Sequence, residues 1–308
     1  MVVLGTWRHM RPRERREALE GYLGILPWVL GFLAFTIGPM LASIYFSLTQ
    51  WDIVRPPKWI GLANYIKLFT DDPLFSIALR VTVTYVVLSV PLKLLAGLGL
   101  SLLLNLKVRA MNIFRTIFYI PAVLSGVAVA LMWIWIMHPE MGVINLLLSR
   151  VGIQGPKWFW APETALISVV IMNLWYVGGD AVIYLAGLQN IPPHLYEAAE
   201  IDGANRWHRF RSVTLPLLTP TLFLQLVTGL ISAFQMFTSV YIITRGGPLK
   251  ATFFYMLYLY QTAFEDFNMG YASALAWVLT IIIVLCSIVV FRTSTRWVYY
   301  EDSGEAGK

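Results

Sequence analysis

Long stretches without a charged side chain divide the sequence into apolar segments separated by short polar ones. Six long segments contain at most one Lys, Arg, Asp or Glu: residues 21–51, 81–106, 116–139, 164–193, 212–244 and 267–291. A helix needs about 20 apolar residues to cross the roughly 30 Å hydrocarbon core of a membrane. Because backbone polar groups in lipid must be hydrogen-bonded internally, the pattern predicts an all-α membrane protein with six membrane-spanning helices.

The polar positions also define the ends of this membrane domain. Residues 1–20 are expected to form a basic N-terminal tail, residues 21–291 the six-helix domain, and residues 292–308 a C-terminal tail. A further uncharged run, residues 251–264, is too short to span and is rich in Tyr and Phe. We expect it to form an interfacial helix.

The composition agrees with this pattern and excludes several classes of protein. Hydrophobic residues make up 58% of the chain and charged residues only 13%, whereas soluble domains carry about 25% charged residues. So little charge excludes an ordinary soluble domain, and so much apolar content excludes disorder. The single cysteine, Cys286, excludes a disulfide within the chain, and no Cys/His spacing matches a metal site.

The distribution of basic residues predicts the orientation in the membrane. With six spans both termini lie on one side, and the segments on that side carry twice as many Lys and Arg residues as the opposite loops. This excess predicts that both termini are cytoplasmic. The basic residues form short flanks rather than one patch, which indicates contact with anionic membrane lipid and argues against nucleic-acid binding.

The cytoplasmic segment 190–216 between the fourth and fifth spans is predicted to form two short helices joined by a turn. Pro193 suits the first position of a helix, and Glu197 lies early in that helix, where the helix dipole favours negative charge. Gly203 ends the helix and permits a sharp turn. A second helix containing Arg206 then runs into the fifth span.

This segment resembles the EAA loop of ATP-binding-cassette (ABC) importer permeases, in which E-A-A is followed by a spaced G and then by I-x-L-P. The chain has Glu197-Ala198-Ala199, Gly203 and Val213-Thr214-Leu215-Pro216, with Val in place of Ile. The sequence in and around this motif is similar to that of the carbohydrate-importing, maltose-type branch of these permeases. Four runs carry the similarity: LAGLQNIP (185–192), EAAEIDGA (197–204), TLPLLTPT (214–221) and ITRGGPLKAT (243–252).

The resemblance implies the transmembrane domain of a type I ABC importer in the inner or plasma membrane of a prokaryote. It implies that the first helix of the loop sits on a separate ATPase subunit. The residues expected at that contact are Glu197, Ala198, Ala199, Glu200, Asp202, Gly203 and Arg206. The alternative is an amphipathic interfacial helix without a partner.

The resemblance also implies partner chains. They are a second permease subunit that usually differs from the first, two ABC ATPase subunits, and an extracytoplasmic solute-binding protein. The sequence has no G-x-x-x-x-G-K-[ST] phosphate loop and no catalytic constellation. We therefore expect a chain that is not itself an enzyme and holds no cofactor, with ATP and Mg²⁺ bound by the partner ATPase.

Lys93 and Asp180 are the two charges inside the predicted spans. An intramembrane charge is costly and should face a partner or a water-filled cavity. Two hypotheses follow: the residues pair between the second and fourth spans, or Asp180 lines a transport pathway.

Further polar and aromatic residues of the fourth and fifth spans suit a sugar, which presents hydroxyl groups and apolar ring faces. The candidate pathway residues are Asn173, Trp175, Tyr176, Asp180, Gln225, Ser232 and Gln235. The alternative role for each is an interhelical hydrogen bond or packing. Gly178-Gly179 indicates either close helix packing or a break in the helix.

The sequence favours an ATP-driven importer of sugars, or oligosaccharides, and two other functions stay open. An importer for a polar phosphoester such as glycerol phosphate would need cationic residues along its pathway, and Lys93 is the single candidate. An ion-coupled secondary transporter commonly shows inverted repeats, which are not apparent here, and it has no need of an EAA loop.

Overall fold

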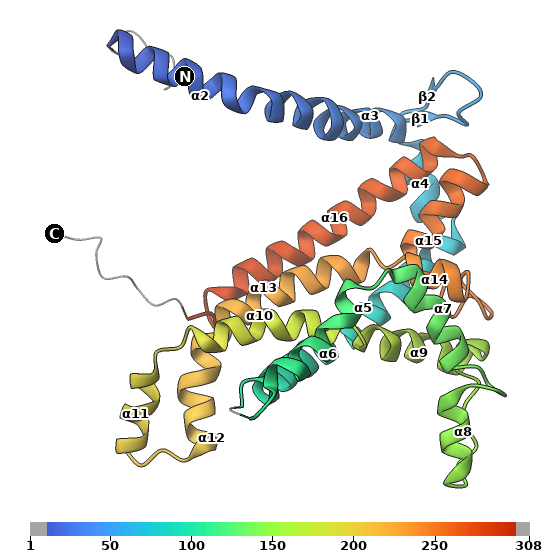
Figure 1. Ribbon diagram of the computed structural model, residues 1–308. Helices are drawn as coiled ribbons and strands as arrows, with labels where there is room; N and C mark the ends of the chain where they lie inside the picture. The colour runs from blue at the N-terminus through green and yellow to red at the C-terminus, as the bar shows by residue number, and fades with distance from the viewer. Residues whose placement is uncertain (1–10, 107, 300–308) are drawn as a thin grey trace. The chain divides into compact units, whose positions relative to one another are not determined.

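The computed structural model describes residues 11–106 and 108–299 (Figure 1). Regular structure in these residues is helical except for two short strands, β1 (Thr49–Gln50) and β2 (Lys58–Trp59), which pair antiparallel with Thr49 opposite Trp59. The chain forms two units, Met1–Lys67 with Thr262–Trp277, and Leu68–Gln261 with Val278–Lys308. Arg8, Lys107 and Lys308, which contribute to the orientation argument, lie outside the described residues.

The first unit begins with one long helical segment. It consists of α2 (Pro12–Phe32), a π-helical turn (Leu33–Ile37) and α3 (Gly38–Ser47). The helix therefore starts well before residue 21, within the predicted tail. Two ion pairs one helical turn apart, Arg13–Glu17 at 3.1 Å and Arg16–Glu20 at 2.9 Å, stabilise this charged extension.

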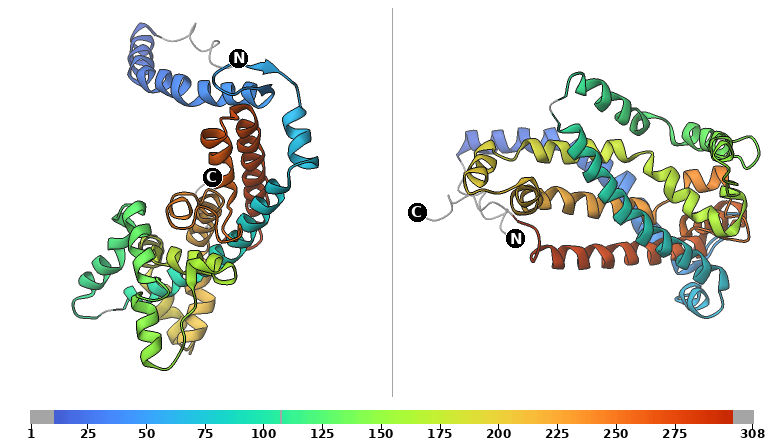
Figure 2. Two further views of the ribbon diagram at one scale, coloured as in Figure 1. Left: turned by 90° about the vertical axis from the view of Figure 1, so that its right-hand side faces the viewer. Right: turned by 90° about the horizontal axis from the view of Figure 1, so that it is seen from below.

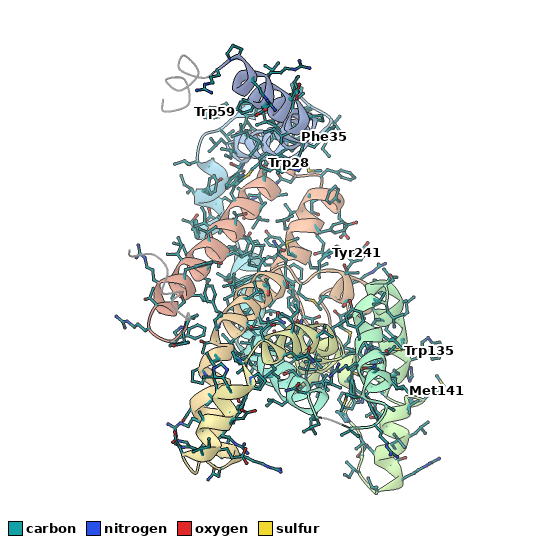
Figure 3. The ribbon with its side chains drawn as sticks, turned by 60° about the vertical axis from the view of Figure 1, so that its left-hand side comes forward. Trp28, Phe35, Trp59, Trp135, Met141 and Tyr241 are labelled. Atoms are coloured by element: carbon teal, nitrogen blue, oxygen red, sulfur yellow. The ribbon has the colours of Figure 1, made fainter. Side chains whose placement is uncertain are left out.

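Side chains of the first span are largely exposed. Trp28 and Phe35, both labelled in Figure 3, are 71% and 84% exposed. At the end of the span, Asn64 of α4 (Ala63–Thr70) donates to the carbonyl oxygens of Ser47 and Thr49, both at 2.9 Å. These two bonds fix the chain where it leaves the helix and enters the β1–β2 hairpin.

The second unit is organised around three helices. These are α5 (Pro73–Leu104), α10 (Val177–Gln189) and α13 (Leu215–Phe234). Asp72 caps α5 by accepting from the backbone N–H groups of Leu74 and Phe75. All three pairs of these helices are in contact, and α5 crosses α10 and α13 in the right-hand view of Figure 2.

The third predicted span, expected as one helix over residues 116–139, is sharply broken. It consists of α6 (Met111–Val123) and α7 (Gly126–Ile136), which are bent by 102°. Pro121 has no backbone N–H to donate, and α6 ends two residues later. Leu124 and Ser125 are extended, with ψ of 147° and 131°, so the backbone leaves the helical region before Gly126 begins α7.

The fourth predicted span is bent as well. Helix α9 (Pro162–Leu174) ends at Trp175-Tyr176, and α10 continues after a bend of 46°. The two glycines that follow serve the packing of α10. A Cβ atom on Gly178 would collide with the carbonyl oxygen of Phe118 in α6, and one on Gly179 would meet Ala122. The break and the close packing therefore occur side by side.

Four helical segments in the described residues are long and apolar enough to cross a membrane: Arg16–Ser47, Pro73–Leu104, Arg206–Ile243 and Met269–Ser294. Counting each bent pair as one span raises the number to six, the number expected from the sequence. The Arg206–Ile243 segment includes α12 (Arg206–Arg209), a π-helical turn (Phe210–Thr214), α13 and α14 (Thr238–Ile243).

The remaining elements are short apart from α16. They are α8 (Val143–Arg150), a 3₁₀ turn (Trp158–Trp160), α11 (Pro193–Ile201), α15 (Tyr255–Tyr260), a π-helical turn (Gln261–Glu265) and α16 (Met269–Ser294). Helix α15 lies in the run expected to be interfacial, and it packs against α5. The Tyr255 N–H donates to Thr82 Oγ1 at 2.9 Å, and the Phe254 and Tyr85 rings lie 5.0 Å apart.

We predict that Gly178→Ala destabilises the protein because its Cβ would force α10 away from α6. Overpacking of this kind costs about 1–3 kcal/mol. The measurement is the midpoint of thermal unfolding of the detergent-purified protein. Gly99→Ala is the matched control, since a Cβ on Gly99 of α5 meets no atom within 4 Å. Equal midpoints for the two variants would contradict the packing role of Gly178.

Candidate functional site

A polar cavity lies among the three central helices of the second unit. Its volume is about 190 Å³. Its wall consists of Tyr85, Ser89, Val90, Lys93 and Leu94 of α5, Asn173 of α9, Asp180 and Tyr184 of α10, Gln225, Gly229, Ser232 and Ala233 of α13, and Met236. Four of the seven residues predicted for the pathway therefore meet here: Asn173, Asp180, Gln225 and Ser232.

Lys93 and Asp180 form an ion pair across this cavity. Lys93 Nζ and Asp180 Oδ2 are 3.0 Å apart, and about a quarter of each side chain is exposed. The two sequence hypotheses for these charges are therefore compatible, since the pair bridges α5 and α10 and also lines the cavity. The opposite charges cancel, so the pair leaves the cavity wall with no net charge from these two groups.

Gln225 ties the third helix to the same point. Its side-chain amide donates to the Asp180 carbonyl oxygen at 3.1 Å, and the side chain is buried. Gly97 allows this close approach on the α5 side, since a Cβ there would press on the Tyr184 ring and on Asp180 Cβ. Asp180 is thus held by α5 through its carboxylate and by α13 through its backbone.

Buried hydroxyl groups in the cavity wall have unused hydrogen-bonding capacity. Among the described residues, the hydroxyls of Tyr85, Ser89 and Tyr184 form no hydrogen bond of good geometry, although Tyr85 lies close to Ser89 and Asn173. A buried polar group without a partner costs about 1–3 kcal/mol. A hydroxylated ligand or ordered water in the cavity would recover this free energy.

The other three predicted pathway residues lie outside the cavity. Trp175 is at the α9–α10 break with its ring 5.8 Å from that of Trp133, and Tyr176 is beside it. Gln235 is exposed and lies just after Phe234, the last residue of α13. It is therefore not part of the helix that carries Gln225 and Ser232.

The cavity also includes residues that sequence reasoning did not select, chiefly Tyr85, Ser89 and Tyr184. Tyr85, Ser89 and Lys93 are spaced four residues apart, which puts them on one face of α5. Tyr184 is likewise four residues after Asp180 in α10. Helical spacing from the two intramembrane charges is the signal that could have identified them.

The second candidate site is the α11–α12 loop, residues 190–216, which Figure 1 shows as two neighbouring helices projecting beyond α10 and α13. Gly203 joins the helices with φ of +80°, a left-handed conformation that favours glycine. The Ala204 N–H donates to the Ala199 carbonyl, which closes the end of α11. Asn205 caps α12 by accepting from the His208 N–H at 2.8 Å.

One face of α11 is directed away from the rest of the chain. His194, Glu197, Ala198 and Ile201 are all exposed and follow the spacing of a single helical face. Ile201 is 87% exposed, and Trp207 of α12 is 68% exposed. Apolar side chains this exposed at a projecting tip are typical of a surface that another protein covers. Neither residue was selected from the sequence.

The predicted contact residues divide between two roles. Glu197 and Ala198 lie on the exposed face, whereas Glu200 forms an ion pair with Arg209 at 2.9 Å inside the loop. Asp202, Gly203 and Arg206 are exposed at the turn, and Ala199 is half-buried. A shallow hollow of about 460 Å³ lies at this turn, lined in part by Ala199, Asp202 and Gly203.

Comparison with known proteins covers both sites. The family model described as binding-protein-dependent transport system inner membrane component matches residues 89–297. This range includes both residues of the ion pair, Lys93 and Asp180, and the whole α11–α12 loop. The chain is 47% identical over 295 residues to the probable ABC transporter permease protein YesP of Bacillus subtilis, covering 94% of this chain and 95% of that protein.

Two further relatives resemble the chain over most of its length. The trehalose/maltose transport system permease protein MalF of Thermococcus litoralis is 35% identical over 287 residues, covering 92% of this chain and 95% of that one. The crystal structure of a bacterial ABC transporter that imports the acidic polysaccharide alginate matches with a TM-score of 0.80 and 26% identity, covering 92% and 98%.

We predict that Lys93→Met and Asp180→Asn each destabilise the protein, because each leaves an uncompensated charge among apolar helices. Removing one partner of a fully buried ion pair costs about 3–5 kcal/mol, and we expect less here because about a quarter of each side chain is exposed. The double variant removes both charges and should be more stable than either single variant. Thermal unfolding of the purified variants measures this, and a double variant no better than the worse single one would refute the coupling.

Proposed function

The chain belongs to the family of binding-protein-dependent transport system inner membrane components and is a carbohydrate ABC importer permease; from that premise we propose how its two sites divide the work. The cavity around Lys93 and Asp180 is part of the path that a sugar follows through the membrane. The α11–α12 loop couples this path to ATP hydrolysis in a separate subunit. The observation that carries the proposal is that α10 and α13 form the cavity wall and also lead into the two ends of the loop.

The chemistry of the cavity supports a saccharide cargo. Sugars present many hydroxyl groups, and the Asp180 carboxylate and Gln225 amide can exchange hydrogen bonds with them. The hydroxyls of Tyr85, Ser89 and Tyr184 supply further groups without a partner in the described residues. Relatives named for trehalose/maltose and lactose transport support a sugar cargo, and we extend the proposal to oligosaccharides.

A phosphoester cargo is less favoured by the same wall. Lys93 is the cation among the cavity residues, and its charge is already balanced by Asp180. A phosphate group would have to displace the Asp180 carboxylate or lie beside it, and both arrangements cost electrostatic energy in a low-dielectric site. Glycerol phosphate therefore remains the alternative that a transport assay must exclude.

The exposed face of α11 supports contact with an ATPase subunit. Glu197 presents a carboxylate suited to a basic residue, Ala198 permits close approach, and Ile201 supplies apolar area. We propose that two ABC ATPase subunits bind ATP and Mg²⁺, that the loop of each permease docks on one of them, and that this chain carries no cofactor. The second permease is a different, related chain, so the importer is a heterodimer in its membrane part.

An external solute-binding protein completes the proposed importer. The alginate importer has been crystallised with its pentasaccharide-bound periplasmic protein, and that structure matches this chain with a TM-score of 0.82. In the proposed mechanism, closure of the ATPase dimer moves the coupling loops, and the permease helices switch between inward and outward openings. The proposal also keeps both termini in the cytoplasm of a prokaryotic cell, because a loop that meets a cytoplasmic ATPase would follow four of the six expected spans and precede two.

The cargo proposal predicts ATP-dependent uptake of a saccharide by the complete importer in liposomes. The panel consists of radiolabelled maltose, trehalose, lactose, alginate oligosaccharides and glycerol 3-phosphate, each with the cognate binding protein. We expect uptake of at least one saccharide, and none without ATP. Uptake of glycerol 3-phosphate alone would replace the cargo, and uptake driven by an ion gradient without ATP would refute the ABC mechanism.

The coupling proposal predicts that Glu197→Lys abolishes ATP-driven uptake while membrane insertion stays normal. Reversing a charge at a docking contact should weaken ATPase binding at least about tenfold. Co-purification of the ATPase with the tagged permease measures this, alongside uptake. Glu140→Lys is the matched control, because it makes the same charge reversal on an exposed loop outside the α11–α12 segment. Normal uptake by the Glu197 variant would refute the assignment.

A further inference from the structure

Two side-chain links join α11 to the helical segment that continues into α13. Glu200 Oε2 and Arg209 Nη1 are 2.9 Å apart, and the hydroxyls of Tyr196 and Thr214 are hydrogen-bonded at 3.1 Å. Tyr196 and Glu200 are one helical turn apart on α11, and their partners follow in the reverse order along the chain. The links therefore form a two-rung ladder between antiparallel segments.

Burial shows that the ladder is anchored on the α13 side. Thr214 is buried, and only 24% of the Arg209 side chain is exposed, whereas Glu200 is 69% exposed. Tyr196 also packs against a cluster of buried residues that contains Leu188 of α10 and Leu218 of α13. A fully exposed ion pair contributes little, but a charge-assisted bond from an arginine whose side chain is only 24% exposed loses less rotational freedom on forming.

The length of α11 explains why the links are needed. It has nine residues, and isolated helices shorter than about 12–15 residues are marginal in water. Its connection to α12 is the turn at Gly203, an exposed residue with a left-handed backbone. A force applied to a short helix that is attached through a glycine turn would rotate it about the turn or unwind it. Side chains that bind it to the neighbouring helix prevent this.

We propose that Arg209, together with Glu200, Tyr196 and Thr214, is a positioning device that makes α11 and the start of α13 move as one body. The proposal rests on the coupling function above and assigns Glu200 to this brace rather than to the ATPase contact. A displacement of the Glu197 face then reaches Gln225 and the cavity through the continuous helix, instead of being absorbed at Gly203. Arg209 and Thr214 were not selected as coupling residues from the sequence.

The test compares Arg209→Gln with Arg211→Gln in the complete importer, purified through a tag on this chain and reconstituted in liposomes. Arg211 is an exposed arginine two residues along the same segment and lies outside the ladder. The readout is the amount of saccharide imported per ATP hydrolysed, using the panel sugar that the unmodified importer takes up. We expect the ratio to fall about tenfold for Arg209→Gln, the factor that one charge-assisted hydrogen bond can supply, and to stay normal for Arg211→Gln.

Charge exchange distinguishes pairing from a general effect of charge. Glu200→Arg and Arg209→Glu should each lower the ratio, and the double variant should restore most of it. Tyr196→Phe and Thr214→Val should lower it in the same direction through the second rung. In all of these variants the ATPase should still co-purify with the permease, because the exposed Glu197 face is unchanged.

Four results would overturn the proposal. They are a normal ratio for Arg209→Gln, an equal fall for Arg211→Gln, no recovery in the exchanged double variant, and loss of the ATPase from the Arg209→Gln complex. The last would make Arg209 a docking residue rather than a positioning one. Glu197→Lys distinguishes a failure of the coupling function from a failure of the brace. If this variant leaves uptake normal, the coupling function itself is wrong. If it abolishes uptake and Arg209→Gln does not change the ratio, only the brace is wrong.

Discussion

The ion pair between Lys93 and Asp180 is the interaction on which the central arrangement of helices depends. Either charge is costly alone among apolar spans, and pairing the two side chains at 3.0 Å stabilises the contact between α5 and α10. Gln225 brings α13 to the same residue through the Asp180 carbonyl, and Gly97 gives the helices room to approach. The cavity is the space that remains around this junction, and its polar character follows from the groups that form it.

The same helices that meet at Asp180 also connect the cavity with the α11–α12 loop. Helix α10 leads from Asp180 to α11, and the segment that begins at Arg206 continues through α13 to Gln225. In the coupling proposed above, a displacement of the loop would act on both sides of the cavity at once. Long-range coupling requires an element with two arrangements that both sites can bias, and helices joined at both ends suit this requirement.

The sequence predicted the helical segments and the loop well because each depends on local information. Charge-free length identifies a span, and Gly203 with its flanking residues identifies a turn. The bend after Pro121 was not predicted, because membrane helices often tolerate proline when neighbouring helices satisfy the freed carbonyl groups. For the fourth span the sequence left a break open at Gly178-Gly179, and the structure has the break just before them, at Trp175-Tyr176. The cavity was only half predicted, since which face of α5 is turned inward depends on packing, and Tyr85 and Ser89 are ordinary residues within an apolar span.

The size of the cavity limits what this chain can do alone. Sites that enclose small molecules usually measure about 300–1,000 Å³, whereas the space around the ion pair measures about 190 Å³. Residues of α5, α9, α10 and α13 line this space. An oligosaccharide is larger than the space, so it would extend beyond these helices. A second permease chain facing these helices would enlarge the space and add its own polar groups. Selectivity would then depend on both chains, with the neutralised Lys93–Asp180 pair contributing hydrogen bonds without a net charge.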